Sequence, residues 1–324
     1  MRSTRLSPPL ALAVLGFACG TPATPPDASE VPDASGEGDS ALDAYAAPDA
    51  FVADLVVTNT ALSGPGSLTA VIAFVNGNCD AERDTVTFDI PPSDANYLTV
   101  RGQSFWRIEP PDPIQLTCPV VIDGTTQTAR RGNTNTMTFG GMPTGMGAVP
   151  LPVIEGPEIE LRGARFQSSA AGVEIRGLAF SSFETSMPDC LIEQNLLGSE
   201  PYAAVPAPRA DTRLIYAERG ITVRANSFVW NPGTAIGIFA GDRGIRIEDN
   251  LMTGAGFRFQ VQTFQAIDAV IQHNALLGLG FASNIEWFQA MGGSVTENTF
   301  GAMPFFSSGM PATESGNVLA PPPP

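Results

Sequence analysis

Three side chains that could carry out acid–base or metal chemistry recur at one fixed spacing in the second half of the sequence. Asp249, His273 and Glu297 lie 24 residues apart, and His273 is the only histidine among the 324 residues. Two carboxylates beside an imidazole could bind a divalent metal ion or transfer a proton. Polar side chains also occupy exposed turns without any chemical role, so a structural interpretation stays open beside the catalytic and metal-binding ones.

The spacing of these residues belongs to an internal repeat. Segments 221–228, 245–252, 269–276 and 293–300 align without gaps, and each carries an asparagine at the same position. These asparagines are Asn226, Asn250, Asn274 and Asn298. Segments 173–180 and 190–197 fit the same template, with Leu178 and Asn195 at that position. Because Asn195 lies off-centre, we expect a loop insertion at 198–220 and a shortened turn next to it.

Apolar residues alternate within each repeat, as in Ile221 and Val223, which is the period of a half-buried strand. Further strand-like runs occupy 235–239, 257–262 and 285–288. A unit of this kind cannot close a core alone, but it can stack on its copies about 4.8 Å apart. The sequence therefore predicts an all-β, right-handed parallel β-helix solenoid with about 24 residues per coil over residues 51–310.

The repeated asparagine has a structural interpretation in such a solenoid. We expect it at the turn between two sheets, in the left-handed backbone conformation that asparagine tolerates. The stacked amides would then hydrogen-bond from coil to coil as a ladder.

Two further positions of the repeat form columns on the outside of the predicted solenoid. One column alternates in charge, which indicates a surface ion-pair ladder or, alternatively, an arginine-bearing groove for acidic sugars. It consists of Arg176, Glu193, Arg224, Glu248, Gln272 and Thr296. The other column precedes the asparagines and places Asp249, His273 and Glu297 on three successive coils. Its earlier members are Gly177, Gln194 and Ala225.

A capping helix is predicted within residues 55–80, because a solenoid exposes an apolar end unless something covers it. Leu68, Val71, Ile72 and Val75 follow helical spacing, with Ser67 as the N-cap and residues 76–77 as the stop. Among the cysteines, Cys190 aligns with inward-pointing positions and is expected to be a buried free thiol. Cys79 and Cys118 remain, and we expect them to form a disulfide in an oxidising compartment.

Both ends of the chain differ from the repeats. Residues 1–18 are typical of a signal peptide, and Cys19 resembles the lipidated cysteine of bacterial lipoproteins, although Gly16 replaces the usual leucine. Residues 19–50 contain seven acids and no base, which predicts a disordered tether. Residues 311–324 are expected to form an irregular tail. The chain is therefore expected to be exported, either as a lipoprotein of the bacterial outer membrane or cell surface, or in secreted form.

The repeats resemble the right-handed parallel β-helix of the pectate-lyase-like superfamily. Segments 57–68, 84–91 and 121–127 resemble a subgroup of secreted bacterial β-helix proteins, and the resemblance covers about residues 55–300. That subgroup implies export more than a reaction. Lyases of the superfamily hold calcium with clustered acids and use a basic residue, and its hydrolases use close aspartates. This chain contains no lysine, and no column on the aligned strand stacks two adjacent carboxylates.

The charge balance restricts the possible partners. The formal net charge is −16, which opposes binding to nucleic acid. We expect no cofactor. We expect the protein to be non-catalytic and to bind or scaffold extracellular polysaccharide or other surface molecules, including surface proteins. The alternative is a polysaccharide lyase or glycoside hydrolase acting on an acidic glycan, with Ca²⁺ bound only in the lyase case. Insertion 198–220, with Tyr202 and Tyr216, is the expected place of ligand contact.

Overall fold

The computed structural model describes residues 55–79, 82–141, 151–198, 213–228, 236–253, 259–277, 285–288, 291–301, 305–308 and 311–320. These residues belong to a single unit, residues 50–324. The predicted signal peptide, Cys19 and the acidic tether lie outside the described residues. Among the residues that are described, none forms a helix long and apolar enough to cross a membrane.

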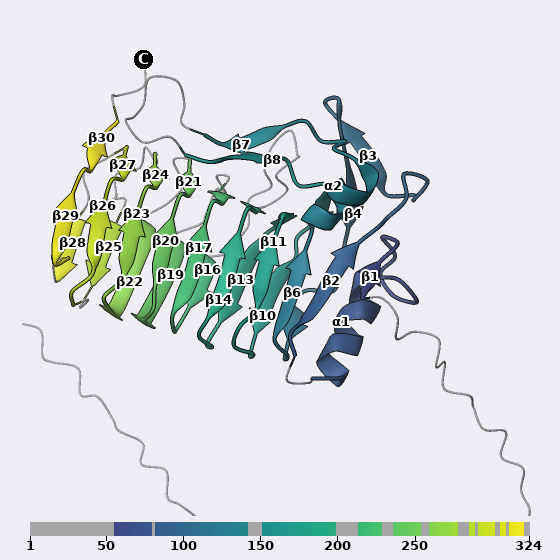
Figure 1. Ribbon diagram of the computed structural model, residues 1–324, viewed down its shortest axis with the longest axis horizontal. Coiled ribbons are helices and arrows are strands. Elements are labelled where there is room, and N and C mark those ends of the chain that lie inside the picture. Colours follow the sequence, from purple (N-terminus) through teal and green to yellow (C-terminus); the bar gives the residue numbers. More distant parts are fainter. Residues whose placement is uncertain are drawn as a thin grey trace, which may run out of the picture. The chain divides into compact units, whose positions relative to one another are not determined.

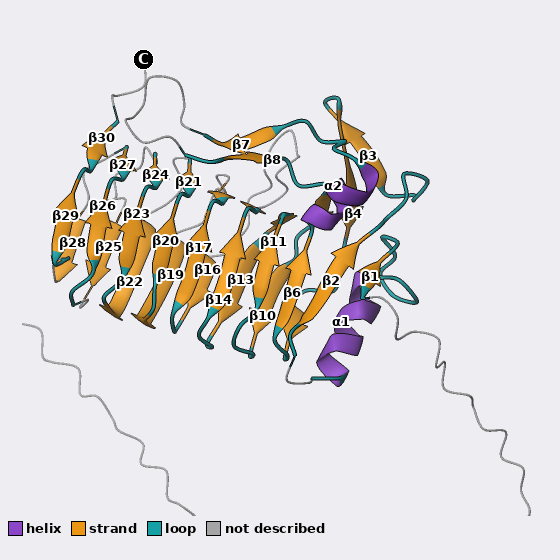
Figure 2. Ribbon diagram, in the orientation of Figure 1, coloured by secondary structure: helices purple, strands orange, loops and turns teal. Residues whose placement is uncertain are grey.

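Within the described residues the strands form three long sheets, here called A, B and C, and one separate hairpin (Figures 1 and 2). The chain passes through sheets C, A and B in turn, so that each coil adds one strand to each sheet. From β10 (Arg165–Ser168) onward, every pairing between successive coils is parallel. The fold is therefore the predicted parallel β-helix.

Sheet A contains the strand that precedes the asparagine in each repeat. Its strands, in order of pairing, are β1 (Val56–Val57), β2 (Asp84–Phe88), β6 (Val120–Asp123), β11 (Glu174–Arg176), β14 (Cys190–Glu193), β17 (Ile221–Arg224), β20 (Arg246–Glu248), β23 (Val270–Gln272), β26 (Ser294–Thr296) and β29 (Thr313–Ser315). Sheet B follows each asparagine. It contains β3 (Tyr97–Val100), β4 (Gln103–Ile108), β9 (Ile159–Leu161), β12 (Leu178–Phe180), β15 (Leu196–Leu197), β18 (Ser227–Phe228), β21 (Leu251–Met252), β24 (Ala275–Leu276), β27 (Thr299–Phe300) and β30 (Val318–Leu319).

Sheet C forms the remaining side of each coil. Its strands are β5 (Ile114–Leu116), β10 (Arg165–Ser168), β13 (Ser182–Thr185), β16 (Arg213–Ala217), β19 (Ile236–Arg243), β22 (Phe259–Ile267), β25 (Ile285–Phe288) and β28 (Phe305–Ser308). A separate antiparallel hairpin is formed by β7 (Thr138–Gly140) and β8 (Val153–Glu155). Leu151, next to β8, packs against Leu251 of β21 and Ala275 of β24.

The register between coils follows the repeat, although the coils differ in length. Val223, Ile247, Ile271 and Val295 are direct neighbours in sheet A and are fully buried. The asparagine position advances by 17 residues from Leu178 to Asn195, by 31 to Asn226, and then by 24 per coil. The short coil next to the long one reproduces the expected combination of shortened turn and insertion.

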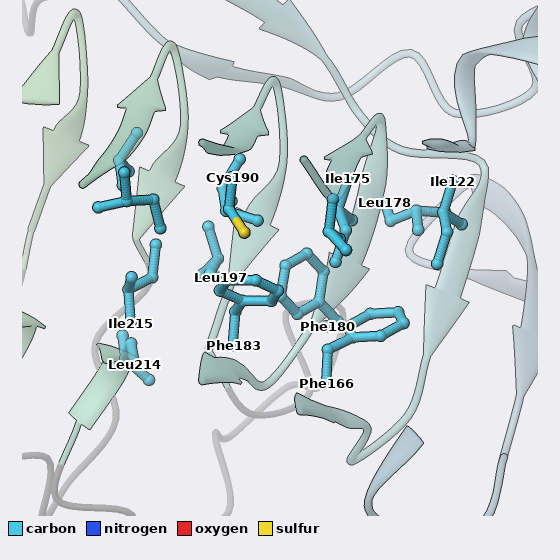
Figure 3. Close-up of a cluster of buried hydrophobic side chains, with 14 of the residues drawn as sticks. Ile122, Phe166, Ile175, Leu178, Phe180, Phe183, Cys190, Leu197, Leu214 and Ile215 are labelled. Carbon is cyan, nitrogen blue, oxygen red and sulfur yellow. The ribbon is translucent and has the colours of Figure 1, made fainter. Parts of the chain in front are cut away.

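The interior is filled by apolar side chains from all three sheets (Figure 3). Phe166, Phe180 and Phe183 lie within it at 0–1% exposure, and the rings of Phe166 and Phe180 meet edge to face. Cys190 is a buried free thiol, as predicted, and burial raises its pKa. The stacked apolar rows bury each coil against the next, which a single coil could not achieve alone.

The N-terminal end of the stack is covered by helix α1 (Leu68–Gly77), as the periodicity predicts (Figure 1). The hydroxyl of Ser67 accepts a hydrogen bond of 3.2 Å from the backbone nitrogen of Ala70. The helix buries the predicted face, which consists of Leu68, Val71, Ile72 and Val75. Cys79 and Cys118 form the predicted disulfide, which joins the end of the helix to the chain just before β6. A second helix, α2 (Thr125–Arg131), follows β6.

The prediction of an irregular tail over 311–324 was wrong for residues 311–320. These residues form one more coil, with strands β29 and β30. The coil was not predicted because it is shortened to 19 residues and no longer matches the 24-residue period. Glu314 occupies the row of Val295 in this coil and is exposed, which hid the apolar pattern. The long coil that carries the predicted insertion 198–220 also contains strand β16, so Tyr216 lies on sheet C and not on a loop, whereas Tyr202 lies outside the described residues.

Candidate functional site

The repeated asparagines form a buried ladder along the corner between sheets A and B. Each side-chain amide oxygen accepts hydrogen bonds from the backbone and side-chain nitrogens of the asparagine one coil earlier, at 2.9–3.1 Å. The ladder extends beyond the four predicted residues to Asn195 and Asn317. The predicted asparagines are 0–1% exposed, so they hold successive coils together and present nothing to a ligand.

The backbone at this corner corrects one sequence prediction. The left-handed conformation belongs to the residue before each asparagine and not to the asparagine itself, with φ of 52°, 57°, 54° and 56° at Ala225, Asp249, His273 and Glu297. The positive φ turns the chain into sheet B while the asparagine side chain stays inside. Side chains from the preceding position are therefore the ones that reach the surface.

The structure brings Asp249, His273 and Glu297 together on three consecutive coils. Nε2 of His273 contacts a carboxylate oxygen of Glu297, and Nδ1 lies 3.7 Å from Oδ1 of Asp249. The side chains are 35%, 37% and 55% exposed along this row. Partial burial, opposed by the charge of His273, raises the pKa of Asp249. Chemically, the row can share and release protons.

The predicted charge column on sheet A forms ion pairs between coils. Arg176 donates to Asp123 at 2.7 Å, and Arg224 donates to Glu193 at 2.6 Å. These hydrogen bonds raise the pKa of both guanidinium groups. Gln272 then donates to Glu248 at 3.1 Å. Asp123 extends the column by one coil, and it was missed because the long insertion after β6 hides its place in the repeat.

Sheet C carries a second outward row, in which polar side chains give way to aromatic ones. Gln115 donates to Gln167 at 2.7 Å, and Gln167 donates to Glu184 at 3.0 Å. The strand register continues this row to Tyr216 and Phe239 on the next two coils. Their rings stack with centroids 5.2 Å apart and an interplanar angle of 21°. A polar ladder therefore leads directly into an aromatic stack.

The aromatic stack lines a cavity of about 460 Å³ beside the carboxyl-terminal halves of the inner strands β16, β19 and β22 of sheet C, here called the aromatic pocket. It is lined by Tyr216, Glu218, Arg219, Phe239, Gly241, Asp242, Phe264 and Gln265. The ring of Phe264 continues the stack at 6.2 Å from that of Phe239 and is 36% exposed. Gly241 pairs with Phe264 in the neighbouring strand, and a side chain at this position would meet the backbone oxygens of Glu218 and Phe264 at 3.1 and 3.3 Å. Large apolar groups at a surface cavity mark a site of recognition.

Of the pocket residues, only Tyr216 was predicted from the sequence. The usable signal was the alternation of residues 238–240, in which Phe239 is partly exposed while Ile238 and Ala240 are fully buried. The row could not be predicted from the sequence, because the coils over 182–217 differ in length. Glu184 and Tyr216 are therefore not separated by the repeat period, although they are neighbours in the sheet.

Another cavity, of about 520 Å³, lies where α2 and β8 meet the corner of the coils. It borders Gly177 and Gln194, which precede Asp249 in the same column. Asp249, His273 and Glu297 do not line it. Among the described residues, no group of three or more histidine, cysteine, aspartate or glutamate side chains is placed to hold a metal ion.

Comparison with protein-family models gives no match, and neither do comparisons with curated proteins and with solved structures. The fold and the two sites therefore define the class of this protein. It is a parallel β-helix with an aromatic pocket on one sheet and a carboxylate–imidazole row at one corner.

Proposed function

We propose that this chain is an exported β-helix protein that binds extracellular polysaccharide without cleaving it. The observation that carries the proposal is the stack of Tyr216, Phe239 and Phe264 at the aromatic pocket. A sugar ring has an apolar face of C–H groups and a rim of hydroxyls. An aromatic surface with carboxylates beside it complements both parts.

The regular sheet beneath the pocket supports the same proposal. Tyr216 and Phe239 stand on paired parallel strands, so their separation is fixed by backbone hydrogen bonds. A rigid surface loses little conformational freedom when it binds an extended chain. The proposal also includes export to an outer membrane or cell surface, a lipid on Cys19 and kinship to the pectate-lyase-like superfamily. The sequence features described above support these three points.

An enzyme acting on glycans is the second candidate. The raised pKa of Asp249, two coils from Glu297, favours it, because glycoside hydrolysis needs a protonated and an ionised carboxyl group. His273, however, lies between these carboxylates in the row and contacts Glu297, where a sugar ring would have to lie. Binding at the aromatic pocket therefore accounts better for the arrangement.

A glycan array probed with the mature protein tests the proposal. Phe264→Ala and Tyr216→Ala should each weaken binding about tenfold, since truncating an aromatic anchor of a binding site costs about 1–2 kcal/mol. Leu319→Ala is the matched control, because Leu319 is an exposed apolar residue at 56% and lies outside the pocket. Equal binding by the pocket variants, or no glycan bound at all, would refute the proposal. Release of reducing sugar in the presence of calcium would establish the enzyme instead.

A further inference from the structure

We infer that the aromatic pocket takes an uncharged polysaccharide and does not take an acidic one. This inference rests on the proposed function and specifies its ligand. It is drawn from the charges at the pocket, from the polar row that leads into it and from the ion pairing of the arginines on sheet A.

The polar groups at the pocket are suited to hydroxyl donors. Glu218 and Asp242 line it, and carboxylate oxygens accept hydrogen bonds. The hydroxyl of Tyr216 donates to Glu218 at 3.0 Å, which orients that carboxylate beside the ring stack. Carboxylates accept strong hydrogen bonds from sugar hydroxyls and repel a ligand carboxylate. Arg219 also lines the pocket, so its carboxylates outnumber its guanidinium groups.

The row leading into the pocket carries polar groups that are mainly uncharged. Gln115 and Gln167 present amides, which both donate and accept hydrogen bonds. Glu184, Tyr216 and Phe239 follow, and the register continues the row to Gln262 on β22. Since neighbouring strands lie about 4.8 Å apart, the five side chains from Gln115 to Phe239 form a strip of about 19 Å parallel to the coil axis. Such a strip fits an extended chain of several sugar units.

The arginines of the charge column on sheet A are already paired. Arg176 and Arg224 on sheet A bind Asp123 and Glu193, at 2.7 and 2.6 Å. Arg246 binds Glu248 at 2.6 Å. An acidic sugar would have to displace these carboxylates and would approach a chain with a net charge of −16. The arginine-bearing groove considered in the sequence analysis is therefore disfavoured.

Affinity electrophoresis of the mature protein tests the inference with three soluble polymers: hydroxyethyl cellulose, polygalacturonate and chitosan. Hydroxyethyl cellulose should bind, and its affinity should change less than twofold between low salt and roughly 0.15 M salt, because an uncharged ligand is not screened. Polygalacturonate should not bind at either salt concentration. The double variant Glu218→Gln and Asp242→Asn should weaken hydroxyethyl cellulose binding about tenfold. Arg246→Gln on sheet A is the matched control and should leave it unchanged.

The outcomes separate the ligand class from the proposed function. Binding of polygalacturonate that Phe264→Ala abolishes would overturn the inference and leave polysaccharide binding intact. Chitosan binding that exceeds hydroxyethyl cellulose binding and that Phe264→Ala abolishes would also overturn it, by showing recognition of positive charge at the pocket. If no polysaccharide binds in either this assay or the array, the proposed function itself fails.

Discussion

The side-chain amide of Asn226 donates a hydrogen bond of 3.0 Å to the amide oxygen of Asn250, one coil later. The same oxygen accepts the backbone nitrogen of Asn226, also at 3.0 Å. The nitrogen of Asn250 in turn donates to Asn274 and to the carbonyl of Val223. Each asparagine therefore satisfies buried backbone groups that have no partner within their own coil.

Asn250→Ala should lower the free energy of unfolding by about 3 kcal/mol, because it leaves buried groups such as the Asn226 nitrogen and the Val223 carbonyl unsatisfied. Urea unfolding followed by far-UV circular dichroism measures the loss. Asn317→Ala is the matched control: its rung is partly exposed and water can replace its bonds, so the loss should be below about 1 kcal/mol. Equal losses at both positions would contradict a ladder held by burial.

Ala225→Gly should raise the free energy of unfolding by about 0.5–1 kcal/mol. An alanine in the left-handed region costs about 1–2 kcal/mol, which exceeds the entropy cost of glycine. Ala129→Gly, at an exposed position in α2, should instead lower stability by up to about 1 kcal/mol. Chemical denaturation of both variants gives the comparison, and effects of the same sign would disprove the assigned strain.

Asp249→Asn should change the pH dependence of stability. The pKa of Asp249 is raised in the folded protein, so the folded state holds its proton more tightly than the unfolded chain. The wild type then loses stability as pH rises from below the ordinary aspartate value through the raised one. The melting temperature of the asparagine variant should be higher than that of the wild type at pH 7. The difference between the two melting temperatures should disappear in acid.

Melting temperatures measured across this pH range test the effect at Asp249. Glu314→Gln removes a carboxyl group that is exposed on the last coil, and should show no such gap. A difference between Asp249→Asn and wild type that does not vary with pH would assign the effect to backbone preference.

Arg176→Met should lower the free energy of unfolding by about 2 kcal/mol, because it leaves the buried carboxylate of Asp123 without its charged partner and with hydrogen bonds from Thr125 alone. This figure is reduced from that of a fully buried pair, since Arg176 is 35% exposed. Arg246→Met removes an arginine that is 51% exposed and should cost less than about 1 kcal/mol. Adding Asp123→Asn to Arg176→Met should restore part of the loss.

Replacing both Cys79 and Cys118 by serine should cost about 3–4 kcal/mol, since the disulfide closes a loop of 39 residues. Hydrogen exchange should then show faster opening of α1, whose last residue lies next to the bridge. Cys190→Ala, which keeps the bridge, is the control and should leave exchange in α1 unchanged. Unaltered protection in the double serine variant would show that the helix is held by packing alone.

The sequence by itself determined the solenoid, its repeat and its N-terminal cap. These features follow from local patterns: strand alternation around Ile247 and Ile271, helical spacing in 68–75, and the recurrence of Asn250 and Asn274. Once the period is known, residues in matching positions of successive coils are predicted to be neighbours. This prediction also placed Arg224 beside Glu193. Stacking converts a one-dimensional repeat directly into contacts.

Only the tertiary structure decided where the positive φ falls, which residues form the aromatic pocket and that the chain adds a further coil after Phe300. The first depends on which side of the corner the asparagine side chain faces, and a sequence repeat does not encode that side. Tyr216 and Phe239 became neighbours through strand pairing across coils of unequal length, where the constant period fails. The last coil was hidden because Glu314 occupies an apolar position that has become exposed.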